Sequence, residues 1–286
     1  MKSKEILIGR VLKKRDIGEA LRECAAANLT PAYAPFITHL RARAEREDFI
    51  WGDHFTSPSV LIFGSSQGRK IEVYAHGPNF YSTPEHIVQG LATQIHCGAM
   101  IYPQQLFDAQ SETPVDSNMF VIDSELANKW PRGSYGIEKP TDEHCRKYGG
   151  EIEGIPMIAK NNPRLGPSLG VDEITLDTYL TTYEKSCGRE IGVWHDFSEE
   201  YFQTTPTQPR ARFLLLTHDT TGVSTTYPYV NGALIGLNPA FVPSPSPKKT
   251  AAYRDPVTSM RRSQPLLERI YTHAYIDQRG RVMLRE

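Results

Sequence analysis

The feature that most constrains the fold is a pair of strand-like runs joined by a glycine-containing turn, at the start of Ser59–Gln105. Val60–Phe63 and Lys70–Ala75 carry the apolar and β-branched residues typical of strands, and Gly64–Gly68 lies between them. Side chains alternate along a strand, so Glu72, Tyr74 and His76 share one face, opposite the apolar residues. The sequence therefore predicts a β-hairpin with one apolar and one polar face.

A long helix is predicted directly after this hairpin, over Thr83–Tyr102. Thr83 suits the N-cap, and Glu85 complements the positive end of the helix dipole. Apolar residues then recur every four positions, at Ile87, Leu91, Ile95 and Ala99. Gly90 and Gly98 weaken this helix and indicate that another backbone approaches closely. We predict that the helix is central and buried.

The remaining patterns predict a single α+β domain over residues 1–286, with a curved, mostly antiparallel sheet around the central helix. Asp16 caps a first helix, and Pro31 and Pro35 open a second. Residues 108–187 are rich in Gly, Pro and Asn, which predicts a loop-rich insertion, either a lid or a surface decoration; residues 238–265 form a Pro-rich loop. Late strands are expected over Glu190–Phe197, Arg212–His218, Val223–Leu237, Ile270–Asp277 and Val282–Leu284.

Composition excludes several classes of protein. The chain has 286 residues, 32 Lys and Arg against 33 Asp and Glu, and a net charge of −1, so it lacks the basic excess of a nucleic-acid binder. The four cysteines are widely spaced, which argues against a disulfide framework. No apolar run approaches the length of a membrane span, and charges interrupt the N-terminal segment. We expect a cytoplasmic protein with no nucleic-acid or membrane partner.

The catalytic candidates are Glu85 and His76, because they lie at the junction between a predicted strand and the helix that follows it. A histidine beside a carboxylate in a cleft is suited to general acid–base chemistry. An alternative interpretation makes His76 a surface or turn-capping residue and Glu85 a simple partner of the helix dipole. Both interpretations remain open from the sequence.

The substrate-binding candidates are Arg69, Tyr74, Phe80 and Tyr81. Arginine binds a carboxylate with two parallel hydrogen bonds, and the aromatic rings would form walls for a flat ligand. Alternatively, Arg69 is a solvated residue at the end of a hairpin and the aromatics belong to the core or its rim. The sequence contains no HExxH motif and no histidine pair at helical metal spacing, so we predict no metal and no cofactor. A metal site assembled from distant strands stays open as an alternative.

The order of strand, polar elbow, helix body EHIVQGLATQIHCGAMIY and later strands resembles the hotdog superfamily of acyl thioesterases and dehydratases. The resemblance implies a sheet wrapped around one helix, with catalytic groups near the helix start. It further implies a homodimer paired edge to edge, for which the Ile270–Leu284 hairpin would supply an edge. The predicted function is a small-molecule enzyme that uses Glu and His without metal on an acyl or carboxylate-bearing substrate.

Two alternatives accompany this prediction. The chain order Arg69, His76, Glu85 is similar to that of the functional residues of bacterial β-carboline synthases, which join tryptophan to a small aldehyde. That resemblance implies carboxylate binding by Arg69, proton transfer by His76 and a basic role for Glu85. The other alternative is a non-catalytic ligand-binding or assembly protein, which apolar pocket walls without a perturbed acid or base would favour.

Overall fold

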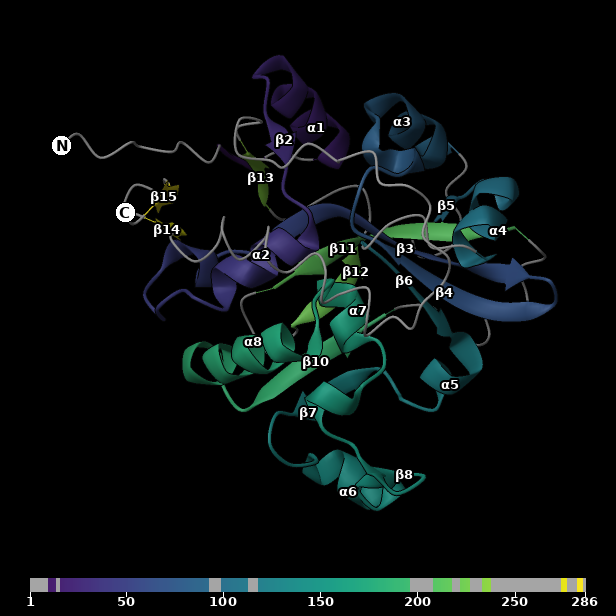
Figure 1. Cartoon of the computed structure of the whole chain (residues 1–286), viewed down its shortest axis with the longest axis vertical. Coiled ribbons are helices and arrows are strands. Elements are labelled where there is room, and N and C mark those ends of the chain that lie inside the picture. Colours follow the sequence, from purple (N-terminus) through teal and green to yellow (C-terminus); the bar gives the residue numbers. More distant parts are fainter. Residues whose placement is uncertain are drawn as a thin grey trace.

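The fold was analysed in a computed structural model, which describes residues 10–13, 16–92, 99–112, 118–195, 208–217, 222–226, 233–237, 274–276 and 282–284. A large mixed sheet crosses the middle of the molecule, with helices on both of its faces (Figure 1). The predicted α+β class is confirmed, but the arrangement of the elements differs from the prediction.

The predicted hairpin is confirmed and forms the longest part of the sheet. Strand β3 spans Phe55–Ser66 and pairs antiparallel with β4, Arg69–Ala75. The turn is shorter than predicted, because β3 continues through Gly64 and only Gln67 and Gly68 remain between the strands, with φ values of 49° and 77°. Two residues with positive φ match the twist of a hairpin. Strand β6, Met119–Asp123, pairs with the far side of β4.

The rest of the sheet extends from β3 in the order β1-β13-β3-β11-β12-β10-β7. Most neighbours are antiparallel, and the pairs β10·β12 and β13·β3 are parallel. The bounds are β1 Val11–Lys13, β7 Gly133–Gly136, β10 Glu190–Trp194, β11 Arg210–Leu216, β12 Val223–Thr226 and β13 Ala233–Leu237. The two short strands at its margins are β2 Thr30–Pro31, on β13, and β5 Met100–Ile101, on β11.

Two apolar clusters pack against opposite faces of this sheet. One face is covered by α1 Ile17–Ala26, α3 Pro84–Ala92 and α4 Gln104–Glu112, which bury Ile17, Ile87 and Phe107 against Phe213 of β11. The other is covered by α2 Ala34–Arg41, α7 Leu165–Leu169 and α8 Glu173–Ser186. Figure 1 shows α1 and α3 above the sheet and α7 and α8 below it.

The N-terminal helices follow the prediction closely. The Asp16 carboxylate accepts a hydrogen bond from the Glu19 N–H at 2.7 Å and caps α1, as expected. Helix α2 has a proline in its first turn and ends at Arg41, whereas the sequence predicts a helix that continues to about Asp48. Its buried residues include Phe36, Ile37 and Leu40, so α2 is part of the core as well as a cover.

The segment 108–187 contains more regular structure than its composition indicates. It holds five-residue helix α5 Ser124–Asn128, α6 Asp142–Tyr148, the hairpin of β8 Glu151–Ile152 and β9 Ile155–Pro156, and the 3-10 helix η4 Ala159–Asn161, besides α7 and α8. Asp123, Thr141 and Asp172 accept hydrogen bonds from the first turns of α5, α6 and α8. Side-chain caps therefore define the starts of these helices where apolar periodicity is weak. Whether the segment acts as a lid stays a prediction.

The prediction of a long central helix is wrong, and the predicted hotdog-like arrangement, which depends on that helix, is wrong as well. Helix α3 ends at Ala92, residues 93–98 lie outside the described part, and Met100–Ile101 is a strand. Val88 of α3 is 52% exposed, so this helix lies on the sheet and is not wrapped by it. Backbone pairing of β5 with β11 is a tertiary contact that overrides the apolar repeat. At Gly90, side chains approach instead of a backbone, because an added Cβ would lie 2.7 Å from Met100 Sδ.

The C-terminal hairpin is described only in its two strands. Strand β14, Ala274–Ile276, pairs antiparallel with β15, Val282–Leu284, as predicted. The Pro-rich loop at 238–265 and the turn after Ile276 lie outside the described residues. The homodimer based on this hairpin stays a prediction. Within the described part of the chain, none of the helices combines the length and apolar character needed to cross a membrane.

Candidate functional site

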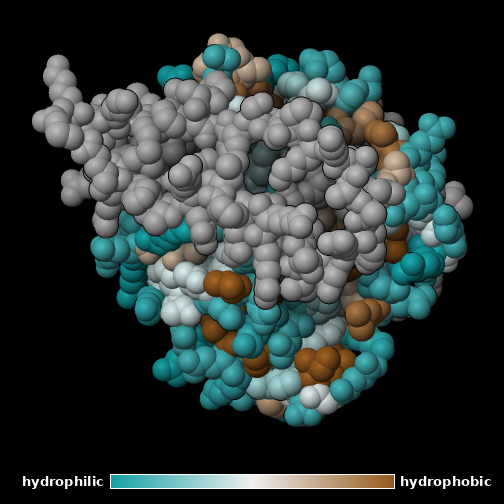
Figure 2. Space-filling model, viewed as in Figure 1, coloured by the Kyte–Doolittle hydropathy of each residue, from teal (hydrophilic) through white to brown (hydrophobic). Residues whose placement is uncertain are grey.

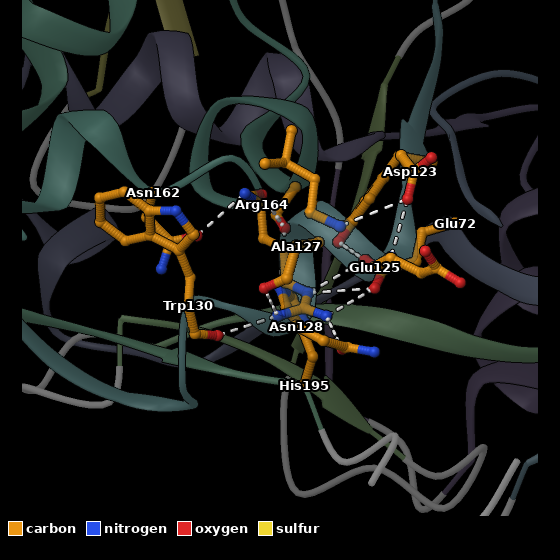
Figure 3. Close-up of polar contacts among 12 residues, drawn as sticks. Glu72, Asp123, Glu125, Ala127, Asn128, Trp130, Asn162, Arg164 and His195 are labelled. Atoms are coloured by element: carbon orange, nitrogen blue, oxygen red, sulfur yellow. Dashed lines mark hydrogen bonds and ion pairs between the residues drawn. The ribbon is translucent and has the colours of Figure 1, made fainter. Parts of the chain in front are cut away.

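A buried polar centre lies between the sheet and the layer formed by α5 and α7 (Figure 3). Its core is the ion pair of Glu72, on β4, with Arg164, directly before α7. The Arg164 guanidinium contacts both carboxylate oxygens, with Nη2 2.6 Å from Oε1 and Nε 3.0 Å from Oε2. The Arg164 side chain is 9% exposed and the Glu72 side chain 2%, so water screens this ion pair very little.

The remaining groups of the pair are also matched. Arg164 Nη1 donates to the carbonyls of Ala127 and Trp130, at 2.7 and 3.1 Å, and Nη2 donates to the Asn128 side chain. The Tyr74 hydroxyl donates to Glu72 at 2.8 Å. Burial alone would lower the pKa of Arg164, but the charge and hydrogen bonds of Glu72 raise it above its ordinary value. This centre therefore joins the end of α5 to the sheet.

A buried histidine continues the polar centre on the side of β10. The Ser168 hydroxyl donates to the Arg164 carbonyl at 2.6 Å, so its oxygen accepts from His195 Nε2 at 3.0 Å. Burial and the charges of Arg164 and Arg212 hold the pKa of His195 well below its usual range. His195 is 6% exposed, so its contact with Ser168 is buried in the described core.

His76 is the second buried histidine of this site, and its hydrogen bonds connect α7 to the sheet. Its Nε2 lies 2.6 Å from the Pro167 carbonyl, which only accepts, so Nε2 carries the proton. Nδ1 then accepts from the Ser59 hydroxyl at 3.0 Å, while the Ser59 oxygen accepts from the Ala34 N–H. Burial lowers the pKa of His76 to about 4 despite the hydrogen bond to Pro167. The prediction that Glu72, Tyr74 and His76 share a face is confirmed, and that face is buried.

The structure does not bring the predicted site residues together. Arg69 lies at the start of β4, exposed and 3.6 Å from Asp123, whereas His76 follows the other end of the strand, about 23 Å away at ~3.3 Å per residue. Glu85 is exposed in the first turn of α3, and no hydrogen bond or ion pair joins it to His76 among the described residues.

The three predicted aromatic residues occupy two different sides of the sheet. Tyr74 belongs to the polar centre, whereas Tyr81, in the 3-10 helix η2 Phe80–Ser82, is buried and donates its hydroxyl to the Ile101 carbonyl. Phe80 stacks on His86 with ring centroids 4.0 Å apart. Their roles as walls for a ligand stay predictions, and their observed contacts are those of core and rim residues.

Sequence reasoning missed Arg164, Ser168 and the part played by His195. These residues come from a segment that was interpreted as an irregular loop and from the end of a strand. The signal that could have found them was Glu72, a carboxylate on a strand whose neighbours are apolar, because a buried carboxylate requires a cationic partner. No local pattern identifies that partner, which lies 92 residues away.

An accessible aromatic residue stands on the opposite face of the sheet. Trp194, the last residue of β10, is 36% exposed. It pairs across the strands with Ser224 of β12, which in turn pairs with Leu215 of β11, while Gly192 and Ser134 form the next row. The alternation of side chains places all of these residues on one face. The indole therefore lies beside the small side chains of Ser224, Gly192 and Ser134, with Leu215 two strands away on the same face.

Figure 2 shows apolar residues as separate spots among hydrophilic ones over the described part of that face. No group of three or more His, Cys, Asp or Glu side chains within the described ranges is placed to hold a metal ion.

Comparison with known proteins identifies the fold. No family model matches the chain, and no curated protein matches it. A solved structure from Nanoarchaeota, in which the C-type lectin fold accommodates massive sequence variation, matches with a TM-score of 0.61. The match covers 81% of this chain and 94% of that chain, at 22% sequence identity. The protein therefore has a C-type lectin-like fold.

This finding corrects the resemblances derived from the sequence. The hotdog superfamily and the β-carboline synthases are both wrong, because the chain shares its fold with the C-type lectin structure. Acid–base catalysis, which was expected with the hotdog fold, is corrected for the same reason. The α+β class is the part of the predicted fold that remains.

Proposed function

We propose that the protein is a non-catalytic ligand-binding protein and that its ligand is a peptide segment of another protein. The observation that carries this proposal is the exposed indole of Trp194 on the face of β7, β10 and β12. Tryptophan is enriched among the residues that dominate protein interfaces, because it buries a large apolar area with little loss of conformational freedom. Its neighbours on this face, Ser224, Gly192 and Ser134, have small side chains.

The fold supports the same proposal. The Nanoarchaeota structure is one in which the C-type lectin fold accommodates massive sequence variation. A recognition protein benefits from such tolerance, because its surface residues change with the ligand while the core is kept. In this chain the buried polar centre around Glu72 and Arg164 supplies a rigid core that does not depend on the exposed face.

The experiment begins with selection of peptides from a random displayed library against the wild-type protein. Binding is then measured with synthetic peptides, by anisotropy of a peptide label and by acrylamide quenching of protein fluorescence. The chain has three tryptophans, and Trp51 and Trp130 are only 4% exposed, so quenching reports mainly on Trp194. A bound peptide should protect that fraction of the fluorescence. Trp194→Ala should weaken binding at least ~30-fold, equivalent to about 2 kcal/mol.

The matched control is Ile174→Ala, on α8 at the other side of the sheet. Ile174 is 71% exposed, so this variant also removes an exposed apolar side chain. It should bind within about twofold of wild type, because surface changes away from the binding face have little effect. Equal peptide affinity for Trp194→Ala and wild type, with both folded by circular dichroism, would exclude this face as the binding site.

A further inference from the structure

Strand β6 forms one edge of the large sheet and leads into α5 (Figure 1). It pairs with β4 from Met119, opposite Ala75, to Asp123, opposite Ile71, and among the described strands it has no neighbour on its other side. All five residues of β6 are partly exposed, whereas the residues of β4 opposite them are buried. The outer side of an edge strand presents backbone groups to which another strand can add.

The alternation of hydrogen bonds along an antiparallel pair shows which backbone groups of β6 point towards β4. The His76 N–H donates to the Asn118 carbonyl at 2.9 Å, so these two residues form a hydrogen-bonded pair. Every second pair along the ladder is of this kind. The N–H and C=O groups of Phe120 and Ile122 therefore also point towards β4.

The backbone groups between them point out of the sheet. They are the N–H and C=O groups of Met119 and Val121 and the N–H of Asp123. None of these groups has a hydrogen-bond partner within the described ranges of the chain. The outer side of β6 therefore offers donors and acceptors in the alternating order that an added strand requires.

The strand also lacks the features that usually protect an open edge. Soluble proteins shield such edges with lysine, proline or a bulge. β6 has the sequence MFVID, without any of these residues, and its register with β4 runs without a shift. Its apolar and β-branched side chains favour the extended conformation.

The register of β6 is self-complementary. In an antiparallel pair centred on Val121, the outward groups of Val121 would meet those of Val121 in a second copy, and the Asp123 N–H would meet the Met119 carbonyl. The same register sets Phe120 opposite Ile122, an aromatic and β-branched pair that stabilises sheets. No like charges lie opposite each other, whereas centring the pair on Asp123 would oppose two carboxylates.

We propose that β6 is the interface of a homodimer, in which two copies pair antiparallel about a twofold axis at Val121 and join their sheets into one. A twofold interface uses the same patch on both copies, as this register does. The strand order β6-β4-β3-β11-β12-β10 places β6 five strand spacings from Trp194, about 24 Å at ~4.8 Å each, so this interface does not depend on the proposed peptide binding.

The first test is sedimentation equilibrium of the whole protein over a range of concentrations. The mass should rise from monomer to dimer with a dissociation constant on the order of 10–100 μM, because one short strand pair buries less area than a standard interface. A monomer mass up to ~1 mM protein would overturn the proposal.

Amide hydrogen exchange, measured by NMR at low and high protein concentration, tests the register. The N–H groups of Val121 and Asp123 should exchange more slowly at the higher concentration, because they become hydrogen-bonded in the dimer. Those of Phe120 and Ile122 should change little, since they are bonded to β4 in both states. A dimer that leaves the exchange of Val121 and Asp123 unchanged would refute this interface.

Val121→Pro removes one outward donor, and proline is tolerated where the N–H of an edge strand faces away from its neighbour. The variant should stay folded by circular dichroism and dimerise at least ~10-fold more weakly, because two hydrogen bonds across the axis are lost. The matched control, Val121→Thr, keeps the N–H and the β-branch and should dimerise within about twofold of wild type. Wild-type dimerisation of folded Val121→Pro, or equal weakening in both variants, would contradict pairing through β6.

Discussion

Removing the charge of Glu72 provides the sharpest test of the buried polar centre. Glu72→Gln keeps the shape of the side chain but leaves the Arg164 guanidinium buried without its counter-charge. Breaking a buried pair in this way costs about 3–5 kcal/mol, because the remaining charge is neither paired nor hydrated. The structure supports this range, since both side chains are almost fully enclosed and the contacts lie at 2.6–3.2 Å.

The measurement is the free energy of unfolding from urea denaturation, with a check that the m-value is unchanged. Arg69→Met is the control, because Arg69 forms the exposed ion pair of the same strand, with side chains 72% and 42% exposed. It should change stability by ~1 kcal/mol or less, as exposed pairs contribute little. A double-mutant cycle of Glu72→Gln with Arg164→Met should give a coupling of at least ~2 kcal/mol. A loss below ~1 kcal/mol for Glu72→Gln would refute the view that this pair is buried and desolvated.

Two further predictions concern the same layer. The pKa of His76 is about 4 in the folded protein and 6.5 in the unfolded chain, so the unfolded state binds more protons between these values, and this residue should lower the stability by about 3 kcal/mol as the pH drops from 6.5 to 4. Urea unfolding at several pH values should show this fall, and the free energy of unfolding of His76→Gln should depend less steeply on pH. An equally steep pH dependence in the variant would contradict the assignment. Gly170→Ala should lower the free energy of unfolding in urea by at least ~2 kcal/mol, because φ is +67° and the new Cβ would lie 2.4 Å from Pro35 Cγ and 2.8 Å from His76 Cδ2. The control Gly68→Ala, where φ is +77° and no atom lies within 4 Å of the added Cβ, should cost only about 1 kcal/mol. Equal losses in the two variants would argue against close packing of α7 on His76.

Parts of the fold that depend on neighbouring residues were predictable. The hairpin of β3 and β4, the cap of α1 by Asp16 and the late strands β10 and β11 follow from alternation, turn residues and capping side chains. The single strand predicted over Val223–Leu237 instead contains two strands, β12 and β13, which pair with different neighbours. The shared polar face of β4 was predictable for the same reason, since side-chain alternation is a local property of an extended chain. Its burial was not, because nothing in residues 69–76 shows what covers them.

The candidate site was predicted poorly, since its members are distant in sequence. Glu85 and Arg69 were chosen for their positions at the ends of elements, and both turned out to be exposed. The exposed Trp194 was predicted as part of a strand, but exposure depends on what packs against each face.

The sequence by itself determined the α+β class, the hairpin and the periodic faces of its strands, because these depend on backbone geometry over a few residues. Only the tertiary structure decided that Met100–Ile101 joins β11 as a strand instead of extending a helix. It also decided that Arg164 meets Glu72 across 92 residues and that the sheet takes the C-type lectin-like order. The physical reason is that backbone pairing and charge burial are settled between segments that meet only when the chain folds, and these terms outweigh local propensity.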